Sequence, residues 1–269
     1  MKFFSVVTVS YDQNEYLSKL FDSVELLATQ DIVCSEILVV DNYGSVVNLD
    51  SSSYSFNIRV IKPGNVGYLP GLSLGAEAAL KDGIDFLVLC NPDLQFISSL
   101  DSDFLACIDS FGVVAPDIFD SDNLPQNPNR RLPFNRIERF VWDMMSASYF
   151  LYRLIMVFHE FKRQLRIGRS GNSQALSDNG VIFLPHGSCL FVSRGVLTDT
   201  GLFKEDIFLW GEEAIIAGMA RQAGYSVFFN SAVRVRHISH TSTSSIGSKA
   251  KFSIWRESYK KYRKYLCRW

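Results

Sequence analysis

Phe86-Leu87-Val88-Leu89-Cys90-Asn91-Pro92-Asp93 is the stretch that decides the fold. Its first five residues have the length and the composition of a buried strand. Pro92 has no backbone N–H and pushes Asn91 toward an extended or turn conformation, so the strand ends there and leaves Asp93 at its carboxyl tip. In an open α/β sheet, the carboxyl tips of the strands form the edge where ligands bind.

Two other apolar segments end in polar residues in the same way. Phe4 to Val9 contains Thr8 and runs into Ser10 and Tyr11, and Ile37 to Val40 runs into Asp41 and Asn42. A single aspartate at a strand end often only begins a turn. Three such ends in one chain favour a shared polar site along one edge of a sheet.

Strand and helix patterns alternate through the first 115 residues. Apolar residues at helical spacing follow the first strand, at Leu17, Leu20, Phe21, Val24 and Leu27. Residues 72–80 form a second helical pattern, which Lys81-Asp82-Gly83 ends. This rhythm predicts an α/β fold with a mostly parallel central sheet and helices on both faces.

The second half of the chain is less regular. Residues 117–132 have little periodicity and predict a loop, whereas residues 136–166 look helical. That helical stretch is too polar to cross a bilayer; it either packs on the domain or lies on a membrane, and the sequence favours neither. From Lys249 onward, alternating aromatic and basic residues predict an amphipathic basic helix. We therefore expect one domain over 1–240, with a helical insertion at about 120–180, and a tail over 241–269.

Charge is distributed unevenly over the 269 residues. The net charge is −1, yet residues 130–169 hold nine Lys and Arg against three Asp and Glu, and residues 249–269 hold eight against one. Basic segments that flank an acidic body suit contact with anionic lipid or with an anionic acceptor. The acidic charge of the body makes nucleic acid a poor candidate partner. Five dispersed cysteines without metal-ligand spacing predict a reduced, cytoplasmic protein.

Four clusters carry candidate chemistry. Asp93 at a strand tip could hold Mg²⁺ or Mn²⁺. The first two strand ends could hydrogen-bond a base and a ribose. The stretch from Asn65 to Gly75 has glycines that would let the backbone approach a ligand, although tight helix packing explains them equally well. Glu212 and Glu213 follow an aromatic stretch, where a carboxylate either partners the helix dipole or gains a raised pKa and acts as a general base.

Two histidines, His237 and His240, follow the last predicted strand. A single histidine is usually structural. Two of them near a predicted metal carboxylate make one a reasonable metal ligand.

Taken in order, these motifs resemble those of a known family. They are Val-Thr-Val-Ser-Tyr, Val-Val-Asp-Asn, Asn-Val-Gly-Tyr, Leu-Cys-Asn-Pro-Asp, Pro-His-Gly-Ser-Cys, Phe-Leu-Trp-Gly-Glu-Glu and Val-Arg-His. The chain is similar to the inverting family 2 glycosyltransferases of the A-type fold, in the bacterial branch described as rhamnosyltransferases. The resemblance covers about residues 3–240, and the shared order makes it more specific than any one motif.

The resemblance implies a role for each cluster. Asp93 and His237 would bind the Mn²⁺ or Mg²⁺ cofactor, with Asn91 in place of the family's first metal aspartate. Glu213 would be the catalytic base, preceded by Glu212. The implied nucleotide-sugar-binding residues are Thr8, Ser10, Tyr11, Asp41, Asn42, Asn65, Gly67 and Asn91. The implied acceptor-side residues are His186, Gly187 and Trp210.

The resemblance also implies a reaction. A sugar would pass from a nucleotide-diphosphate donor, dTDP-rhamnose or a UDP-hexose, to a hydroxyl of a lipid-linked or oligosaccharide precursor of O-antigen or capsule. The basic segments 130–169 and 249–269 would touch the anionic inner face of the cytoplasmic membrane. Two alternatives stay open: a catalytically inactive sugar-nucleotide-binding module, motivated by Asn91, and a nucleotidyltransferase, whose usual Gly-rich loop and basic residue are absent from residues 5–15.

Overall fold

Strand β4 (Phe86–Cys90) is fully buried inside a nine-stranded sheet of the described residues in the computed structural model. The structure describes residues 1–47, 49, 51–80, 83–167, 178–203, 205–238 and 246–267, and only the backbone of 159–167. The strand order is β3-β2-β1-β4-β8-β6-β9-β5, with β7 paired to β9. The other strands are β1 (Lys2–Ser10), β2 (Ile32–Asp41), β3 (Asn57–Ile61), β5 (Leu94–Phe96), β6 (Gly112–Phe119), β7 (Gly180–Ile182), β8 (Cys189–Ser193) and β9 (Ser226–His237).

Parallel pairing dominates the N-terminal half of the sheet. Strands β3, β2, β1 and β4 are all parallel, and β6 is parallel to β9. Strand β8 is antiparallel to both β4 and β6, and β5 and β7 are antiparallel to β9. Strands β4 and β6 therefore point the same way, and β8 inserts between them in the opposite direction. The predicted α/β fold with a central sheet is confirmed, with this mixed C-terminal half.

Helices cover both faces of the sheet, as predicted. They are α1 (Asn14–Val24), α2 (Tyr68–Leu80), α3 (Ser102–Phe111), α6 (Arg194–Thr200) and α7 (Glu212–Gln222), with a short 3₁₀ turn at Glu25–Leu27. One core forms between the sheet and α1 and α3, and a second forms between the sheet and α2, α6 and α7.

Several predicted boundaries shift. Helix α2 begins at Tyr68 rather than at residue 72, and β6 continues to Phe119, into the stretch predicted as a loop. Helix α3 lies in a region where no helix was expected. Its start is fixed by Asp101, whose side chain accepts a hydrogen bond from the backbone N–H of Phe104 at 2.8 Å.

The expected helical insertion consists of two helices, α4 (Arg136–Ala147) and α5 (Tyr149–Ile167). Ser148 between them is extended, which ends the first helix. Asn135 and Glu138 form a reciprocal capping box at the start of α4. Part of the insertion, residues 168–177, lies outside the described residues. Within the described residues, no helix is both long enough and apolar enough to cross a membrane.

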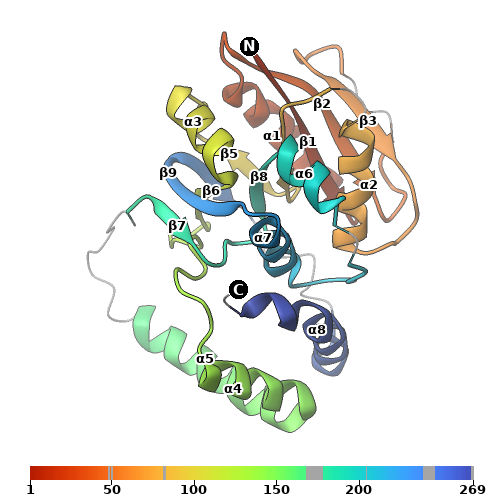
Figure 1. Cartoon of the computed structure of the whole chain (residues 1–269). Coiled ribbons are helices and arrows are strands. Elements are labelled where there is room, and N and C mark those ends of the chain that lie inside the picture. Colours follow the sequence, from red (N-terminus) through yellow and green to blue (C-terminus); the bar gives the residue numbers. More distant parts are fainter. Residues whose placement is uncertain are drawn as a thin grey trace.

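The C-terminal segment packs against the rest of the chain through its aromatic side. It forms α8 (Ser248–Tyr262) and a 3₁₀ turn, η2 (Arg263–Leu266). Tyr259, Tyr262 and Tyr265 are buried in the same core as α7. Several of the basic side chains pair with acids elsewhere in the chain, in the pairs Lys261–Asp206, Arg263–Asp143 and Lys264–Glu205. The aromatic and basic pattern thus holds this segment against its own domain, between α7 and the insertion helices (Figure 1).

Candidate active site

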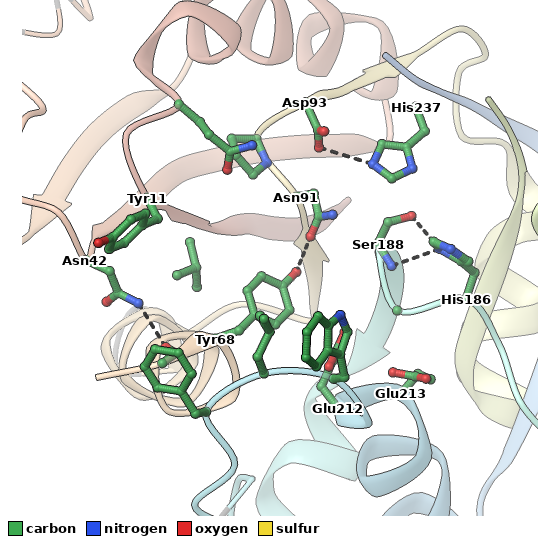
Figure 2. A pocket seen from close by; sticks show the side chains of 18 of the residues that line it. Tyr11, Asn42, Tyr68, Asn91, Asp93, His186, Ser188, Glu212, Glu213 and His237 are labelled. Carbon is green, nitrogen blue, oxygen red and sulfur yellow. Dashed lines mark hydrogen bonds and ion pairs between the residues drawn. The ribbon is translucent and has the colours of Figure 1, made fainter. Parts of the chain in front are cut away.

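A cavity of about 510 Å³ opens at the carboxyl ends of β1, β2 and β4. Most of the predicted site residues line it: Tyr11, Asn42, Asn65, Gly67, Asn91, Asp93, His186, Gly187, Trp210, Glu212, Glu213 and His237. Thr8, Ser10 and Asp41 are buried behind it and are not among the lining residues. Figure 2 shows Asp93 and His237 at one end, the two glutamates at another and Tyr11 with Asn42 at a third.

Asp93 and His237 form a buried pair at the predicted metal end of the cavity. Their Oδ1 and Nε2 atoms lie 3.3 Å apart (Figure 2). The amide oxygen of Gln126 lies 2.9 Å from Nδ1 of His237, so Nδ1 donates to it and Nε2 faces Asp93. Two electron-rich atoms this close need a proton or a cation between them. A carboxylate oxygen and a ring nitrogen are both ligands that divalent metals take, so Asp93 and His237 could hold such an ion, although no third His, Cys, Asp or Glu joins them among the described residues.

Asn91 stands at the position where the resembled family has its first metal aspartate. Its Oδ1 accepts a hydrogen bond of 2.6 Å from the hydroxyl of Tyr68. Burial, and then the nearby Glu212, raise the pKa of the Tyr68 hydroxyl well above its ordinary value, so this hydroxyl stays protonated and keeps donating. Asn91 is therefore oriented by Tyr68.

The third end of the cavity is lined by the exposed ring of Tyr11 and the buried amide of Asn42, and the ring of Tyr43 lies behind that of Tyr11 without lining the cavity. The rings of Tyr11 and Tyr43 meet edge to face, 5.1 Å apart. The amide nitrogen of Asn42 donates to the carbonyl of Gly67 at 3.0 Å, while its Oδ1 is buried without a hydrogen-bond partner. An unpartnered acceptor in the wall of a cavity is a natural contact for an N–H group of a ligand.

Asp41 shapes the loop that carries Asn42 and Tyr43. Its carboxylate accepts hydrogen bonds from the backbone N–H groups of Tyr43, Gly44 and Val46 at 2.8 to 3.2 Å. Lys62 Nζ lies 4.0 Å from the same carboxylate. The structure therefore places this predicted nucleotide-binding residue one layer behind the cavity wall.

Glu212 and Glu213 begin α7 and lie against the backbone of Gly187. A Cβ atom at Gly187 would come within 2.5 Å of Glu212 Oε1 and 3.1 Å of Glu213 Oε2. Burial, and then the negative charge of Glu213, raise the pKa of Glu212 to about 8, and burial also raises the pKa of Glu213. At neutral pH the pair favours a protonated Glu212 that hydrogen-bonds an ionised Glu213.

The loop 205–211 in front of this pair is held by α8 and η2. Trp210 and Gly211 both have positive φ angles, of 63° and 100°. The ring of Tyr262 packs so closely on Gly211 that a Cβ atom there would meet it at 2.1 Å. The hydroxyl of Ser258 donates to the carbonyl of Leu209 at 2.7 Å. The C-terminal segment thus supports the backbone that presents the carboxylates.

His186 lies between the carboxylate pair and the metal end (Figure 2). The backbone N–H of Ser188 donates to His186 Nδ1, so the neutral ring carries its proton on Nε2. The rings of His186 and His237 have centroids 6.0 Å apart. The predicted acceptor loop therefore adjoins the predicted metal site.

Charge on the cavity wall is acidic. Among the described lining residues there are three carboxylates, at Asp93, Glu212 and Glu213, and no lysine or arginine. Toward a diphosphate, these described carboxyl groups would be repulsive when ionised. A divalent ion held by Asp93 and His237 would supply a compensating positive charge.

Sequence reasoning missed Gln13 and Asn129 among the lining residues, whereas Tyr68, Ser188 and Phe208 stood inside the quoted motifs without being chosen as site residues. Tyr68 and Ser188 adjoin residues that were predicted, and their position beside Gly67 and Gly187 was a usable signal. Asn129 lies in the aperiodic stretch, where nothing in the sequence distinguishes it. His240 lies outside the described residues.

Comparison with known proteins adds one relative and several solved structures. No protein-family model matches the chain. It is 22% identical over 227 residues to the low-salt glycan biosynthesis hexosyltransferase Agl10 of Haloferax volcanii, which is 83% of this chain and 63% of that relative. The chain thus spans less than two thirds of the curated relative.

Two solved structures share the fold. GalNAc-T7, crystallised with UDP, GalNAc and Mn²⁺, matches with a TM-score of 0.61 at 15% identity, over 98% of this chain and 50% of that one. Residues 1–349 of TarS from S. aureus, in complex with UDP-GlcNAc, match with a TM-score of 0.58 at 12% identity, over 98% of this chain and 66% of that one. The fold is that of the A-type glycosyltransferases. At these identities the likeness concerns the fold alone.

Proposed function

We propose that this protein is a metal-dependent glycosyltransferase that uses a nucleotide-diphosphate sugar. The observation that carries the proposal is one cavity with a metal-compatible Asp93–His237 pair at one end and a Glu212–Glu213 pair with raised pKa values at another. Perturbed carboxyls in a cavity are typical of catalytic sites. The hexosyltransferase relative and the nucleotide-sugar complexes with the same fold support the same function.

Donor binding would use three parts of the cavity wall. Tyr11 would contact the base, and Asn42 Oδ1 would accept a hydrogen bond from a base N–H. Asn65, Gly67 and Asn91 would line the path of the ribose and the sugar. Bound Mn²⁺ or Mg²⁺ would neutralise the diphosphate as a Lewis acid, with Asp93 and His237 as its protein ligands.

Glu213 would act as the general base. Its carboxylate would take the proton of an acceptor hydroxyl while that oxygen forms a bond to the anomeric carbon and the bond to the diphosphate breaks. Glu212, neutral at pH 7, would hold Glu213 in place by a hydrogen bond. A single displacement of this kind inverts the anomeric configuration, in keeping with the resemblance to inverting family 2 enzymes.

The donor and the acceptor follow from the resemblance. We propose dTDP-rhamnose or a UDP-hexose as donor, and a hydroxyl of a lipid-linked or oligosaccharide precursor of a surface polysaccharide as acceptor. His186, Gly187 and Trp210 would contact that acceptor. The protein would act in the cytoplasm, at the inner face of the membrane.

Release of nucleoside diphosphate from a panel of sugar nucleotides tests this function. Each donor is incubated with Mn²⁺ and the protein, with and without a lipid-linked acceptor, beside a Glu213→Gln control. Acceptor-dependent release that the control loses is the expected result. Release from no donor, in the presence of a donor shown to bind, would favour an inactive binding module instead.

A further inference from the structure

The outer face of the insertion helices is an exposed apolar surface that the candidate active site does not use. On α4 and α5 alike, large apolar side chains recur at helical spacing and are 38% to 76% exposed. They are Ile137, Phe140, Val141 and Met144 on α4, and Phe150, Leu154, Met156, Val157 and Phe158 on α5. Soluble proteins rarely expose this many large apolar groups together unless the surface binds something.

The inner face of the same helices is firmly packed, so the exposure does not come from a loose attachment. Tyr152 of α5 contacts the rings of Phe252 and Trp255 of α8, with centroids 5.2 and 5.3 Å apart. Trp142 of α4 lies 5.9 Å from Tyr259. Figure 1 shows both insertion helices at the edge of the molecule away from the sheet, with α8 in between. The outer faces therefore point away from the domain.

The charges of this surface are basic. Glu138 is paired with Arg130 at 2.6 Å, and Asp143 is paired with Arg263 at 2.5 Å, so the two acids of α4 and α5 whose side chains are described are neutralised by contacts within the chain. Arg136 and Arg153 are exposed. Apolar side chains flanked by unopposed cations are typical of helices that lie in a membrane interface.

We propose that the outer face of α4 and α5 docks on an anionic lipid surface. Lipid fits better than a second copy, because two copies meeting through this face would bring the exposed Arg136 and Arg153 of both copies together, while Glu138 and Asp143 are already paired within each chain. Anionic headgroups complement the same charges. Phe252, Tyr259, Tyr262 and Tyr265 of the C-terminal segment are buried, so the docking surface is assigned to α4 and α5 rather than to that segment.

The docking surface is close in the chain to the candidate active site. Asn129 lines the cavity, and α4 begins seven residues later at Arg136. The inference goes beyond the proposed sugar transfer and does not need it. If transfer does occur, docking would bring an acceptor held in the same membrane near the cavity.

Vesicle co-sedimentation tests the proposal without any substrate. The full chain is mixed with vesicles of phosphatidylcholine alone or of equal parts phosphatidylcholine and phosphatidylglycerol. We expect binding to the anionic vesicles that weakens at high salt, and at least about tenfold weaker binding for Phe140→Asp with Phe150→Asp. Val181→Asp is the matched control, because Val181 on β7 is a comparably exposed apolar residue (56%).

Three further outcomes decide the proposal. Arg136→Glu with Arg153→Glu should reduce binding to anionic vesicles and not to phosphatidylcholine vesicles. Unchanged binding to anionic vesicles would show that these two arginines do not attract the lipid headgroups. A wild-type protein that stays in the supernatant would overturn the docking itself. Light scattering without vesicles tests whether a second copy of the chain binds this face instead. A dimer that dissociates in the variant Phe140→Asp with Phe150→Asp would make this face a contact between copies and overturn the lipid assignment.

Discussion

Replacing Glu212 with glutamine should remove much of the pH dependence of this protein's stability between pH 4.5 and about 8. Burial, and then the charge on Glu213, raise the pKa of Glu212 from 4.5 to about 8 in the folded state. In the unfolded chain the same carboxyl titrates at its ordinary value. The folded state therefore keeps a proton that the unfolded chain has already released across this window.

The sign and the size of the effect follow from that difference. Stability is fully present below the unfolded pKa, falls as pH rises through the window, and levels off once the folded carboxyl has also ionised. The whole shift corresponds to about 5 kcal/mol, at about 1.4 kcal/mol per pH unit. Because Glu213 titrates together with Glu212, the pair shares this loss and the single substitution recovers only part of it.

Urea unfolding at about pH 5, pH 6.5 and pH 8 measures the effect. Glutamine cannot ionise, yet its amide can still donate to Glu213. The free energy of unfolding of Glu212→Gln should therefore match that of the wild type near pH 5 and exceed it by several kcal/mol near pH 8. Glu15→Gln, on the exposed side of α1, is the control and should follow the wild type. If the free energies of unfolding of Glu212→Gln and wild type changed in parallel between about pH 5 and pH 8, the raised pKa of Glu212 would be wrong.

Four further predictions follow from the same contacts. Glu213→Gln should lower transfer by about 10²- to 10⁴-fold while donor binding stays nearly unchanged, and turnover like the wild type's would refute its role as base. Asp93→Ala should abolish the Mn²⁺ dependence of nucleotide binding in calorimetry, and an unchanged titration with and without Mn²⁺ would count against a metal at this residue. Tyr262→Ala should destabilise the fold by about 3 kcal/mol and lower kcat more than KM, whereas Tyr262→Phe should keep the stability and the kcat of the wild type. Equal kinetics in the two variants would show that the Tyr262 ring does not position the loop 205–211. Gly75→Ala should cost about 1–3 kcal/mol in thermal unfolding, since its Cβ would lie 2.3 Å from a methyl group of Val7, and an unchanged melting temperature would show that α2 shifts freely.

Strand ends were the most informative part of the sequence. The apolar run before Asn91 and Asp93 predicted both a buried strand and a polar edge, and the structure places both side chains in the wall of the cavity. The direction of β8 had no comparable signal. A short apolar run does not indicate whether a strand will be parallel or antiparallel. The antiparallel direction of β8 is seen only from its pairing with β4 and β6.

Asp41 shows why a strand-end residue does not always face the ligand. Its position was predicted correctly, yet three backbone N–H groups of the following loop occupy its carboxylate. Aspartate side chains often bond to nearby backbone in this way, and the outcome depends on loop geometry that a pattern does not contain. Asn42, one residue later, lines the cavity instead.

The C-terminal segment shows that a pattern can predict an amphipathic helix without predicting its contacts. Aromatic and basic residues in alternation predict one apolar face, and α8 has one. The pattern does not say what covers that face. In this fold α7, the loop 205–211 and the inner faces of α4 and α5 cover it, and Tyr262 becomes a neighbour of Gly211. The insertion helices, whose outer apolar face stays exposed, are where the sequence left two interpretations open.

Donor binding in the presence and absence of Mn²⁺ is the first measurement to make, because it tests whether the cavity binds a sugar nucleotide through a metal at Asp93. Thermal unfolding of wild type and Asp93→Ala would be followed against a panel of UDP and dTDP sugars. A ligand at about 100 times its dissociation constant stabilises the folded state by about 2.7 kcal/mol, which a melting curve detects. We expect at least one sugar nucleotide to stabilise the wild type with Mn²⁺, and Asp93→Ala to lose this effect. Stabilisation by none of them, or equal stabilisation of the variant without metal, would contradict this expectation.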